Sequence, residues 1–559
     1  MPSSSVAATV APKLRLTELK LPLDHTPEAL RSAVLERLLL QDVQLASLSI
    51  YRRGYDARKK SAIVFVYTVD VTLVPGTRVK ANLPHVAPAP DTSYKFVTHA
   101  KAMPKIRPVV IGTGPCGLFA ALTLAQMGFC PLVLERGKAV RERTQDTWGL
   151  WRKRVLNPES NVQFGEGGAG TFSDGKLWSQ VKDPLFHGRK VLHELIAAGA
   201  PEEILYVSKP HVGTFRLVKV VEALRAKITA LGGEVRFSAR VETLHVEHGA
   251  VRALTLQTGE EIAAERVVLA VGHSARDTFE MLHAQGVYVE AKPFSVGFRI
   301  EHPQRWIDAA RFGPHAGHQA LGAADYKLVH HARNGRSVYS FCMCPGGTVV
   351  AATSEIGRVV TNGMSQYSRN ERNANAGIVV GIEPADYDFD AAGQPLVSEG
   401  VRGHPLAGIA FQRALESVAY TLGGSSYEAP GQLVGDFMKN RASQAFGEVL
   451  PSYKPGVHLT NLASALPAYA ITAMREALPV FGRQIKAFDH AEAVLTGVET
   501  RTSSPIRIKR CDEREARPYQ SINTEGLFPA GEGAGYAGGI MSAAIDGIKV
   551  AEALARSLT

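Results

Sequence analysis

Cysteine is scarce in this sequence. Its 559 residues include 5 cysteines, and no two of them form a Cys-x-x-Cys pair. So few thiols in so long a chain indicate a reducing compartment, and the missing pair excludes the usual dithiol of disulfide reductases. Cys342 and Cys344 are spaced to share one face of a strand, where packing is the simpler interpretation. Neither the number nor the spacing of the ligands suits a metal site, so none is predicted.

Long apolar runs are absent as well. No stretch reaches the length of a membrane span. The first twelve residues, MPSSSVAATVAP, lack the basic and continuous apolar regions of a signal peptide, so we expect an unstructured tail and a cytoplasmic protein. A net charge of +10 favours anionic ligands. The basic residues are dispersed, so a dinucleotide and an acidic substrate account for them and nucleic acid is not indicated.

A nucleotide-binding pattern occupies residues 109–136, VVIGTGPCGLFAALTLAQMGFCPLVLER. An apolar strand leads into glycines at G-x-G-x-x-G spacing (Gly112, Gly114, Gly117), then a helix, then a second strand that ends at Glu135. These glycines permit a tight turn, backbone approach to a pyrophosphate and close packing of helix on strand. The helix N-terminus attracts phosphates. Glu135 is placed to accept hydrogen bonds from an adenosine ribose and would repel a 2′-phosphate, which favours FAD or NAD over NADP.

Two further glycine-rich segments favour FAD. Residues 161–177, NVQFGEGGAGTFSDGKL, hold five glycines and are predicted to approach an isoalloxazine ring; a glycine loop without a ligand is the alternative. Residues 523–558 combine an apolar strand, Glu532, a glycine turn and a long helix. We expect Glu532 to reach the ribityl hydroxyls and the helix start to stabilise negative charge on the reduced ring. A site that binds NAD alone does not require this second glycine motif.

The rest of the chain divides around these motifs. Residues 14–98 read as a small β-α-β-β module followed by a Pro-rich linker that begins near residue 82. A helix over 214–231, a three-stranded β-meander and a return strand at 267–271 complete a nucleotide domain. Residues 287–505 mix strands (295–302, 337–344, 348–355) with helices (406–422, 477–497) and lack a second G-x-G-x-x-G, which indicates a substrate or cap domain rather than an NAD(P)H domain.

The predicted fold class is therefore α/β. It consists of a Rossmann-like FAD-binding domain with a β-meander (104–286 and 506–559), interrupted by an α+β cap domain (287–505) and preceded by the small α+β module (14–98). A basic turn in that module holds Arg52, Arg53, Arg58, Lys59 and Lys60. A solvated hairpin tip is the simpler interpretation of the turn, and a docking surface for RNA is the alternative.

The motifs resemble those of the glutathione-reductase-type FAD superfamily, in GTGPCG with Glu135, VVLAVGHSARD and GLFPAGEGAGYAGG. The whole chain more closely resembles a family of bacterial FAD-dependent dehydrogenase-like proteins, through RRGYDARKK, NVQFGEGGAGTFSDGKL, FCMCPGGTVVAATSE, TNGMS and ETRTSSPIRIKR. The resemblance implies an FAD domain interrupted by a second domain. It implies the cofactor but does not identify a substrate. The wider superfamily usually has Asp where this chain has Glu532.

Fifteen residues are predicted to bind FAD: Gly112, Gly114, Pro115, Cys116, Gly117, Glu135, Arg136, Gly167, Gly168, Gly272, Gly531, Glu532, Gly538, Gly539 and Ile540. No catalytic residue is identified. The candidates are Asp174, Lys176, Glu355, Arg475 and Arg501, with Asn362 and Glu476 as further polar residues of the cap. Asp174 with Lys176 reads equally as a structural ion pair, and His273 reads as structural. Arg475 or Arg501 could receive an acidic substrate, because guanidinium binds carboxylates with two hydrogen bonds.

These features predict an FAD-dependent oxidoreductase that moves a hydride or electrons at flavin N5 of a small acidic or unsaturated substrate. The electron partner is either transiently bound NAD(P)H or another carrier. Two alternatives stay open: a flavoprotein that binds or modifies RNA through the basic module, and a protein that keeps FAD without catalysis.

Overall fold

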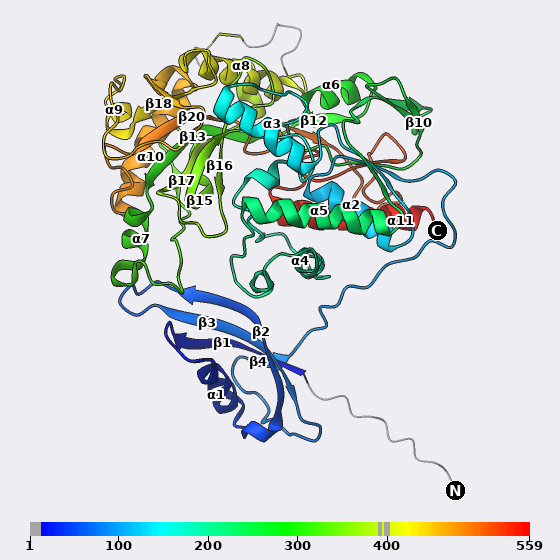
Figure 1. Cartoon of the computed structure of the whole chain (residues 1–559), viewed down its shortest axis with the longest axis vertical. Coiled ribbons are helices and arrows are strands. Elements are labelled where there is room, and N and C mark those ends of the chain that lie inside the picture. The colour runs from blue at the N-terminus through cyan, green and yellow to red at the C-terminus, as the bar shows by residue number, and fades with distance from the viewer. Residues whose placement is uncertain (1–12, 390–393, 396–402) are drawn as a thin grey trace.

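The computed structural model describes residues 13–389, 394–395 and 403–559 (Figure 1). The expected N-terminal tail lies outside these residues. The described chain forms a small N-terminal sheet, a parallel sheet flanked by helices, and a large antiparallel sheet with its own helices. No helix within the described ranges combines the length and apolar character needed to cross a membrane.

The N-terminal module is a four-stranded sheet in the order β2-β3-β1-β4, with one helix against it. Helix α1 buries Leu30, Val34 and Leu38 against the sheet, and each such side chain contributes about 1.5–3 kcal/mol. Strand β4 corrects the predicted linker, because Val86–Pro88 pairs with β1 at the sheet edge, where proline is tolerated. The elements are β1 (Lys13–Pro22), α1 (Pro27–Leu38), η1 (Asp42–Gln44), β2 (Leu45–Asp56), β3 (Val64–Leu73) and β4 (Val86–Pro88).

The second body is a five-stranded parallel sheet in the order β22-β11-β5-β6-β7. Alternate side chains of its strands face opposite sides. Val110, Val133 and Val268 pack on the helices, whereas Val109 and Leu134 pack on the meander β10-β9-β8. A Rossmann-like sheet with helices on one face and a β-meander on the other is thus confirmed.

The elements of this body come from two distant parts of the chain. They are β5 (Val109–Ile111), α2 (Pro115–Gln126), β6 (Leu132–Leu134), α3 (Val140–Lys153), η2 (Ala169–Phe172), α4 (His187–Ala197), η3 (Glu202–Leu205), α5 (Thr214–Ala230), β7 (Glu234–Arg236), β8 (Val241–Glu247), β9 (Ala250–Leu256), β10 (Glu261–Ala263), β11 (Val267–Leu269), α6 (Arg276–Ala284), β22 (Leu527–Pro529) and α11 (Ile540–Ser557). Helix α11 packs against α2 and α4 on the helical face (Figure 1).

The third body is the eight-stranded sheet, in the order β14-β15-β17-β13-β20-β18-β19 with β16 on β15. Its elements are β13 (Phe294–Pro303), α7 (Gln304–Phe312), η4 (Gly313–His315), β14 (Val329–His331), β15 (Ser337–Ala351), β16 (Thr361–Ser365), β17 (Asn373–Ile382), η5 (Pro384–Asp386), α8 (Ala407–Leu422), β18 (Ala429–Leu433), α9 (Val434–Met438), β19 (Val457–Leu459), η7 (Leu462–Ser464), α10 (Ala468–Gln484) and β20 (Val494–Glu499). We call this body, which spans 294–499, the cap.

Two predictions for the cap were wrong. The strands predicted at 337–344 and 348–355 form one strand, β15, because the Pro-Gly-Gly between them is accommodated as an irregularity in the pairing with β17 instead of turning the chain. The helix predicted at 477–497 belongs to α10, which begins earlier and ends at Gln484. The remainder includes β20, a strand buried at all its positions between β13 and β18. A fully buried apolar strand lacks the alternation that would have distinguished it from a helix.

The cap joins the parallel-sheet body through two adjacent crossings. Strand β12 (Val289–Ala291) leads out, and β21 (Ile506–Ile508) returns antiparallel beside it. Above them, the buried carboxylate of Glu416 on α8 accepts two hydrogen bonds from Arg276 and two from Arg501. These cations hold the pKa of Glu416 well below its usual range, although burial opposes them. The domain limits given above stay a prediction; the crossings show where the chain passes between the two sheets.

The N-terminal module docks on the other two bodies. Arg53 exchanges two backbone hydrogen bonds with the segment after η3, through Tyr206 (2.6 Å) and Ser208 (2.8 Å). The ring of Tyr55 contacts Phe312 of α7 edge-on. The exposed basic side chains, Arg52, Arg58, Lys59 and Lys60, lie near the end of the same hairpin. Part of this basic segment therefore contacts the chain itself, and RNA binding stays a prediction.

We expect Glu416→Gln to destabilise the protein by about 3–5 kcal/mol, because it removes the carboxylate that accepts two hydrogen bonds from each of two buried guanidinium groups and leaves the half-buried Glu355 to face both cations. The matched control is Glu428→Gln, which removes a partly exposed pair with Arg154 and should cost under about 1 kcal/mol. Urea unfolding of both variants measures the difference. Equal losses would show that Glu416 does not hold the cap in place.

Candidate functional site

A cavity of about 510 Å³ lies between the parallel sheet and the cap. Residues at or just after the carboxyl ends of four parallel strands, Ile111, Leu134, Ala270 and Ala530, line one side of it. Phe341, Asn362 and Glu499 of the cap strands line the other. Ligands of open α/β sheets bind outside the carboxyl ends of the strands, so this cavity is where a nucleotide is expected.

The glycine turn after β5 has space for backbone only. A Cβ at Gly112, whose φ is +99°, would meet Ala270 O at 2.4 Å. A Cβ at Gly117 would meet Gly112 O at 1.9 Å, which fits its predicted role in packing the helix on the strand. Across the turn, Gly168 approaches so closely that its Cβ would lie 2.8 Å from Gly114 Cα. Two glycine-rich segments thus meet with bare backbone at the cavity wall.

The buried carboxylate of Glu135 fixes this arrangement. One oxygen accepts from Thr113 N (2.9 Å) and Thr113 Oγ1 (2.6 Å) in the glycine turn. The other accepts from Gly137 N (2.9 Å) and Gly165 N (3.0 Å). A carboxylate offers about four lone-pair positions, so a ribose hydroxyl would have to share an oxygen with these donors. The predicted ribose contact stays a prediction, and the observed role of Glu135 is to join three loops.

Two helices begin at the cavity. Helix α2 starts after Gly114 and α11 starts after Gly539, and neither N-cap residue offers a side-chain acceptor to the free N–H groups. The first-turn residues Pro115, Cys116, Ile540 and Met541 line the cavity. Unsatisfied N–H groups and the positive ends of two helix dipoles favour anionic groups. A dinucleotide with a pyrophosphate, and a flavin that becomes anionic on reduction, fit this wall.

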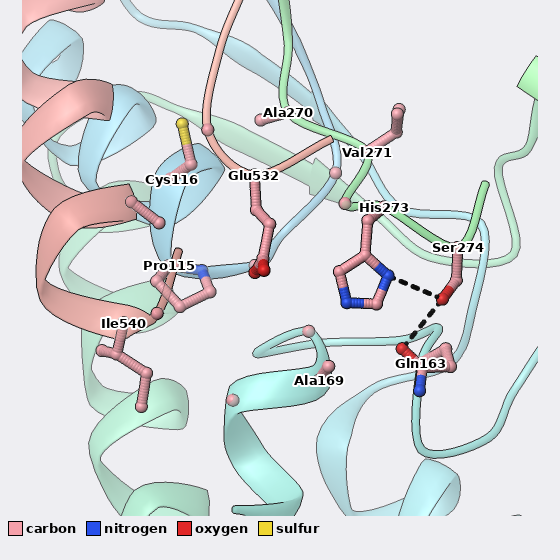
Figure 2. Close-up of a pocket in the computed structure, with 18 of the residues that line it drawn as sticks. Pro115, Cys116, Gln163, Ala169, Ala270, Val271, His273, Ser274, Glu532 and Ile540 are labelled. Atoms are coloured by element: carbon pink, nitrogen blue, oxygen red, sulfur yellow. Dashed lines mark hydrogen bonds between the residues drawn. The ribbon is translucent and has the colours of Figure 1, made fainter. Parts of the chain in front are cut away.

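Glu532 points into the cavity between Pro115 and His273 (Figure 2). Burial raises the pKa of its carboxyl to about 7, and Lys292 opposes part of that rise. A second carboxyl, Glu499, lines the cap side but is paired with Arg299 (2.9 Å). Glu532 makes no ion pair with any described residue, so it can hold or release a proton near neutral pH.

A chain of hydrogen bonds fixes the tautomer of His273 (Figure 2). Gln163 Nε2 donates to Ala352 O (3.0 Å), so its Oε1 faces Ser274 and accepts from Ser274 Oγ (3.0 Å). Arg501 Nη1 donates to the same hydroxyl (3.1 Å). The hydroxyl proton is therefore used, and His273 Nδ1 must donate to Ser274 Oγ (3.1 Å). Burial and then the charges of Arg501 and Arg276 lower the pKa of His273 to about 3. A neutral ring thus presents an unprotonated Nε2.

Two sets of polar side chains at the cavity are held in place by ion pairs or hydrogen bonds. Asp174 is buried and pairs with Lys176 (2.9 Å) and Arg369 (2.5 Å), and these charges lower its pKa although burial opposes them. Lys176 also donates to Met343 O. Asp174 and Lys176 thus form an ion pair, in agreement with one of the two interpretations of the sequence, and a catalytic role stays a prediction. Asn362 Oδ1 accepts from Gly363 N (2.8 Å) and Arg299 Nη2 (3.2 Å). Its Nδ2 bonds to no described residue.

Most of the predicted cofactor residues share this cavity. All fifteen line it except Gly117 and Gly167. Gly167 instead donates its backbone N–H to Thr113 O (2.9 Å), which joins its loop to the glycine turn. Arg136 lines the cavity, but its guanidinium is held by Glu159 and Asp277.

The catalytic candidates separate into two groups. Asp174, Lys176 and Arg501 line the cavity, as do Asn362 and His273. The guanidinium of Arg501 is occupied by Glu416, Ser274 and Ser354, so its predicted pairing with a substrate carboxylate is not supported. Glu355, Arg475 and Glu476 do not line it. Glu355 pairs with Arg276, Arg475 donates to Phe437 O, and Glu476 accepts from His330.

The sequence interpretation missed Gln163, Ser274 and the cavity position of Cys342. Gln163 and Ser274 lie in segments that the motifs had already identified, but their pairing across 111 positions has no sequence signal. In the described ranges, no group of three His, Cys, Asp or Glu side chains is arranged to hold a metal ion.

Comparison with known proteins identifies the family of the chain. A Clostridium beijerinckii protein named "Uncharacterized protein" is 45% identical over 546 residues, which is 96% of this chain and 98% of that protein. The chain belongs to the same family. Within the chain, residues 293–502 match the family described as "FAD-dependent protein, C-terminal domain-like", and residues 13–72 match "Domain of unknown function (DUF8436)". The predicted cofactor, FAD, is confirmed at the level of this family. Membership of the glutathione-reductase-type superfamily stays a prediction.

Solved structures show only distant similarity. The glycine oxidase from Bacillus cereus is 11% identical with a TM-score of 0.35, over 81% of this chain and 96% of that one. The L-proline dehydrogenase from P. horikoshii is 12% identical with a TM-score of 0.33, over 82% and 95%. At these scores the similarities carry no argument about this chain.

Glu532→Gln should change how stability depends on pH in the FAD-free protein. The folded-state pKa of Glu532, about 7, is above the ordinary value of 4.5, so its favourable contribution is complete below pH 4.5 and is lost as the pH rises towards 7. Across this window the wild type should lose on the order of 2 kcal/mol relative to the Gln variant. Urea unfolding at several pH values measures this loss. A constant difference would contradict a raised pKa.

Proposed function

We propose that this chain is an FAD-dependent oxidoreductase that acts on a small acidic or unsaturated molecule. One observation supports it most: a single cavity combines two uncapped helix N-termini and bare glycine backbone on one side with polar groups of the cap on the other. The first side suits a dinucleotide and the second suits a substrate. The family match to FAD-dependent proteins agrees with this division.

The residues that would hold FAD follow from their positions. Gly112, Gly114 and Pro115 would receive the pyrophosphate at the start of α2. Gly538, Gly539 and Ile540 would face the flavin at the start of α11. Glu135 and Arg136 lie at the end of β6, where the adenosine is expected. When bound, FAD supplies two-electron oxidation and reduction.

Two side chains between these regions can manage protons. Glu532 exchanges a proton near neutral pH, because burial brings its pKa to about 7. His273 stays neutral and keeps Nε2 as an acceptor, because Ser274 holds the proton on Nδ1 in place. The cavity thus offers one proton donor, Glu532, and one fixed acceptor, His273 Nε2, and the protonation of each has its own cause.

Polar groups of the cap and of the glycine-rich loop would position the substrate. Asn362 Nδ2 of the cap and the ammonium group of Lys176 in the loop offer donors to an electron-rich group such as a carboxylate or carbonyl oxygen. Lys327 adds an exposed cation at the lining. Phe341 and Trp178 supply apolar surface beside these donors. This combination supports a small acidic or unsaturated substrate. The electron partner, NAD(P)H or another carrier, is open.

The cofactor site can be tested with Gly538→Val. A Cβ at Gly538 meets no atom within 4 Å, and the residue lines the cavity, so the added side chain would fill cofactor space without a clash in the FAD-free protein. We expect the affinity for FAD to fall at least about tenfold, a loss of about 1.4 kcal/mol. Quenching of flavin fluorescence on binding gives the affinity.

The control is Gly381→Val, at a glycine of β17 where an added Cβ would likewise meet no atom within 4 Å and which lies outside the cavity lining. Its affinity for FAD should match the wild type. A yellow wild-type protein is required first. A colourless protein that does not take up FAD would overturn the proposed function.

Substrate positioning can be tested with Asn362→Leu in the FAD-loaded protein. Small carboxylates and α,β-unsaturated acids are screened anaerobically for a change in the flavin spectrum, starting from either redox state. For a substrate found in this way, loss of one hydrogen bond to a charged group should raise KM about tenfold or more. Asn334→Leu, at an exposed position outside the cavity lining, is the control. An unchanged KM would remove Asn362 from the substrate site.

A further inference from the structure

Two thiols occupy the cap wall of the cavity. Cys342 is half-buried and lines the cavity, and Cys344 is fully buried directly behind it. The Cys344 thiol donates to Cys342 O (3.3 Å), so the second sulfur is turned towards the first residue. The sequence alone favoured a packing role for this pair. Its position at the cavity requires another explanation.

The backbone at this point is unusual. Between Phe341 and Cys344, β15 advances three residues while its partner β17 advances two, which is a β-bulge. Cys342 has φ +41°, in the left-handed region that glycine adopts without strain and other residues rarely enter. A residue held in such a conformation at a cavity points to a functional role for its side chain.

The surroundings favour a thiolate at Cys342. Lys176 donates to Met343 O, the carbonyl between the two cysteines, and Arg299 Nη1 donates to Cys342 O (2.9 Å). The neighbouring Cys344 side chain, followed by the charges of Lys176 and Arg299, lowers the pKa of Cys342 well below its ordinary range, although burial opposes them. The interaction with Cys342 and burial raise the pKa of Cys344. One thiol is thus suited to attack, and the other keeps its proton.

We propose that Cys342 and Cys344 are a dithiol–disulfide pair that exchanges two electrons with bound FAD. The proposal rests on the proposed function, because it needs FAD in the cavity. In the oxidising direction the Cys342 thiolate and the Cys344 thiol form a sulfur–sulfur bond and lose two electrons and one proton. Both electrons and the proton pass to oxidised FAD, which is the only co-reactant. The reverse direction returns two electrons and a proton from reduced FAD and breaks the bond.

The arrangement matches what such a pair requires. The attacking thiol is accessible from the cavity and has a lowered pKa, and a resolving thiol lies beside it. The pair also lies close enough to the flavin wall for the charge of Cys342 to contribute to the raised pKa of Glu532. The chain would thereby store two electrons in addition to those held by FAD. The dithiol itself would then be an electron partner of the flavin.

The first test counts thiols in the FAD-loaded wild type, with no variant needed. Protein reduced with dithiothreitol and desalted anaerobically, then denatured, should show all five thiols. Protein oxidised in air should show three, the five less the two in a Cys342–Cys344 bond, and the peptide that holds both cysteines should be lighter by two hydrogen atoms. Five thiols in both samples would overturn the pairing.

The second test counts electrons by anaerobic dithionite titration of the oxidised protein, followed by flavin absorbance and thiol number. The wild type should take up four electrons per FAD, and Cys344→Ser and Cys342→Ser should each take up two. Cys130→Ser is the matched control, because Cys130 is also half-buried and left-handed (φ +47°) but lies outside the cavity lining; it should take up four. Two electrons in wild type with FAD bound would overturn this inference alone. Absence of bound FAD would overturn the proposed function instead.

Discussion

The site depends on the four hydrogen bonds that the buried Glu135 accepts. They bind together the glycine turn after β5, the chain that leaves β6 and the glycine-rich loop near Gly165. These loops bring glycine backbone to the cavity wall. A single carboxylate with well-aligned donors holds all three loops in fixed positions relative to one another. The cavity wall depends on these hydrogen bonds, because Gly114 and Gly168 can approach each other only when both loops are held in position.

A second carboxylate has the same function on a larger scale. Glu416 holds Arg276 from the parallel-sheet body and Arg501 from the return crossing, so it fixes the cap against the cofactor wall. The same Arg501 also donates to Ser274, the hydroxyl that Gln163 orients and that accepts from His273 Nδ1. Structural and chemical roles are therefore linked at Arg501, and a change in its buried ion pair with Glu416 would alter the hydrogen bonds that hold the proton of His273.

The sequence was informative where local rules apply. Gly112, Gly117, Glu135 and the two helix starts follow from spacing, because each answers a backbone requirement within a few residues. The cap was harder, because β20 is buried on both sides and lacks alternation, so it was taken for helix, and the Pro-Gly-Gly within β15 divided that strand into two in the prediction. Side-chain partners across long separations were not predictable. Arg475 and Glu355 carry suitable groups, but neither lines the cavity, and their closest partners, Phe437 O and Arg276, do not line it either. The bulge that places Cys342 at the cavity arises from pairing with β17, which has no signature within FCMCPGG itself.

The order of the segments has a consequence for synthesis. Strand β11 of the parallel sheet pairs on one side with β5 and on the other with β22, and the second cofactor helix, α11, follows β22. Everything needed for the glycine turn has left the ribosome long before residues 527–557 are translated, and the whole cap is made in between. The nascent chain therefore has a sheet with an open edge and half a cofactor site while the cap folds. The complete FAD site can therefore form only after the last strand and helix have been made.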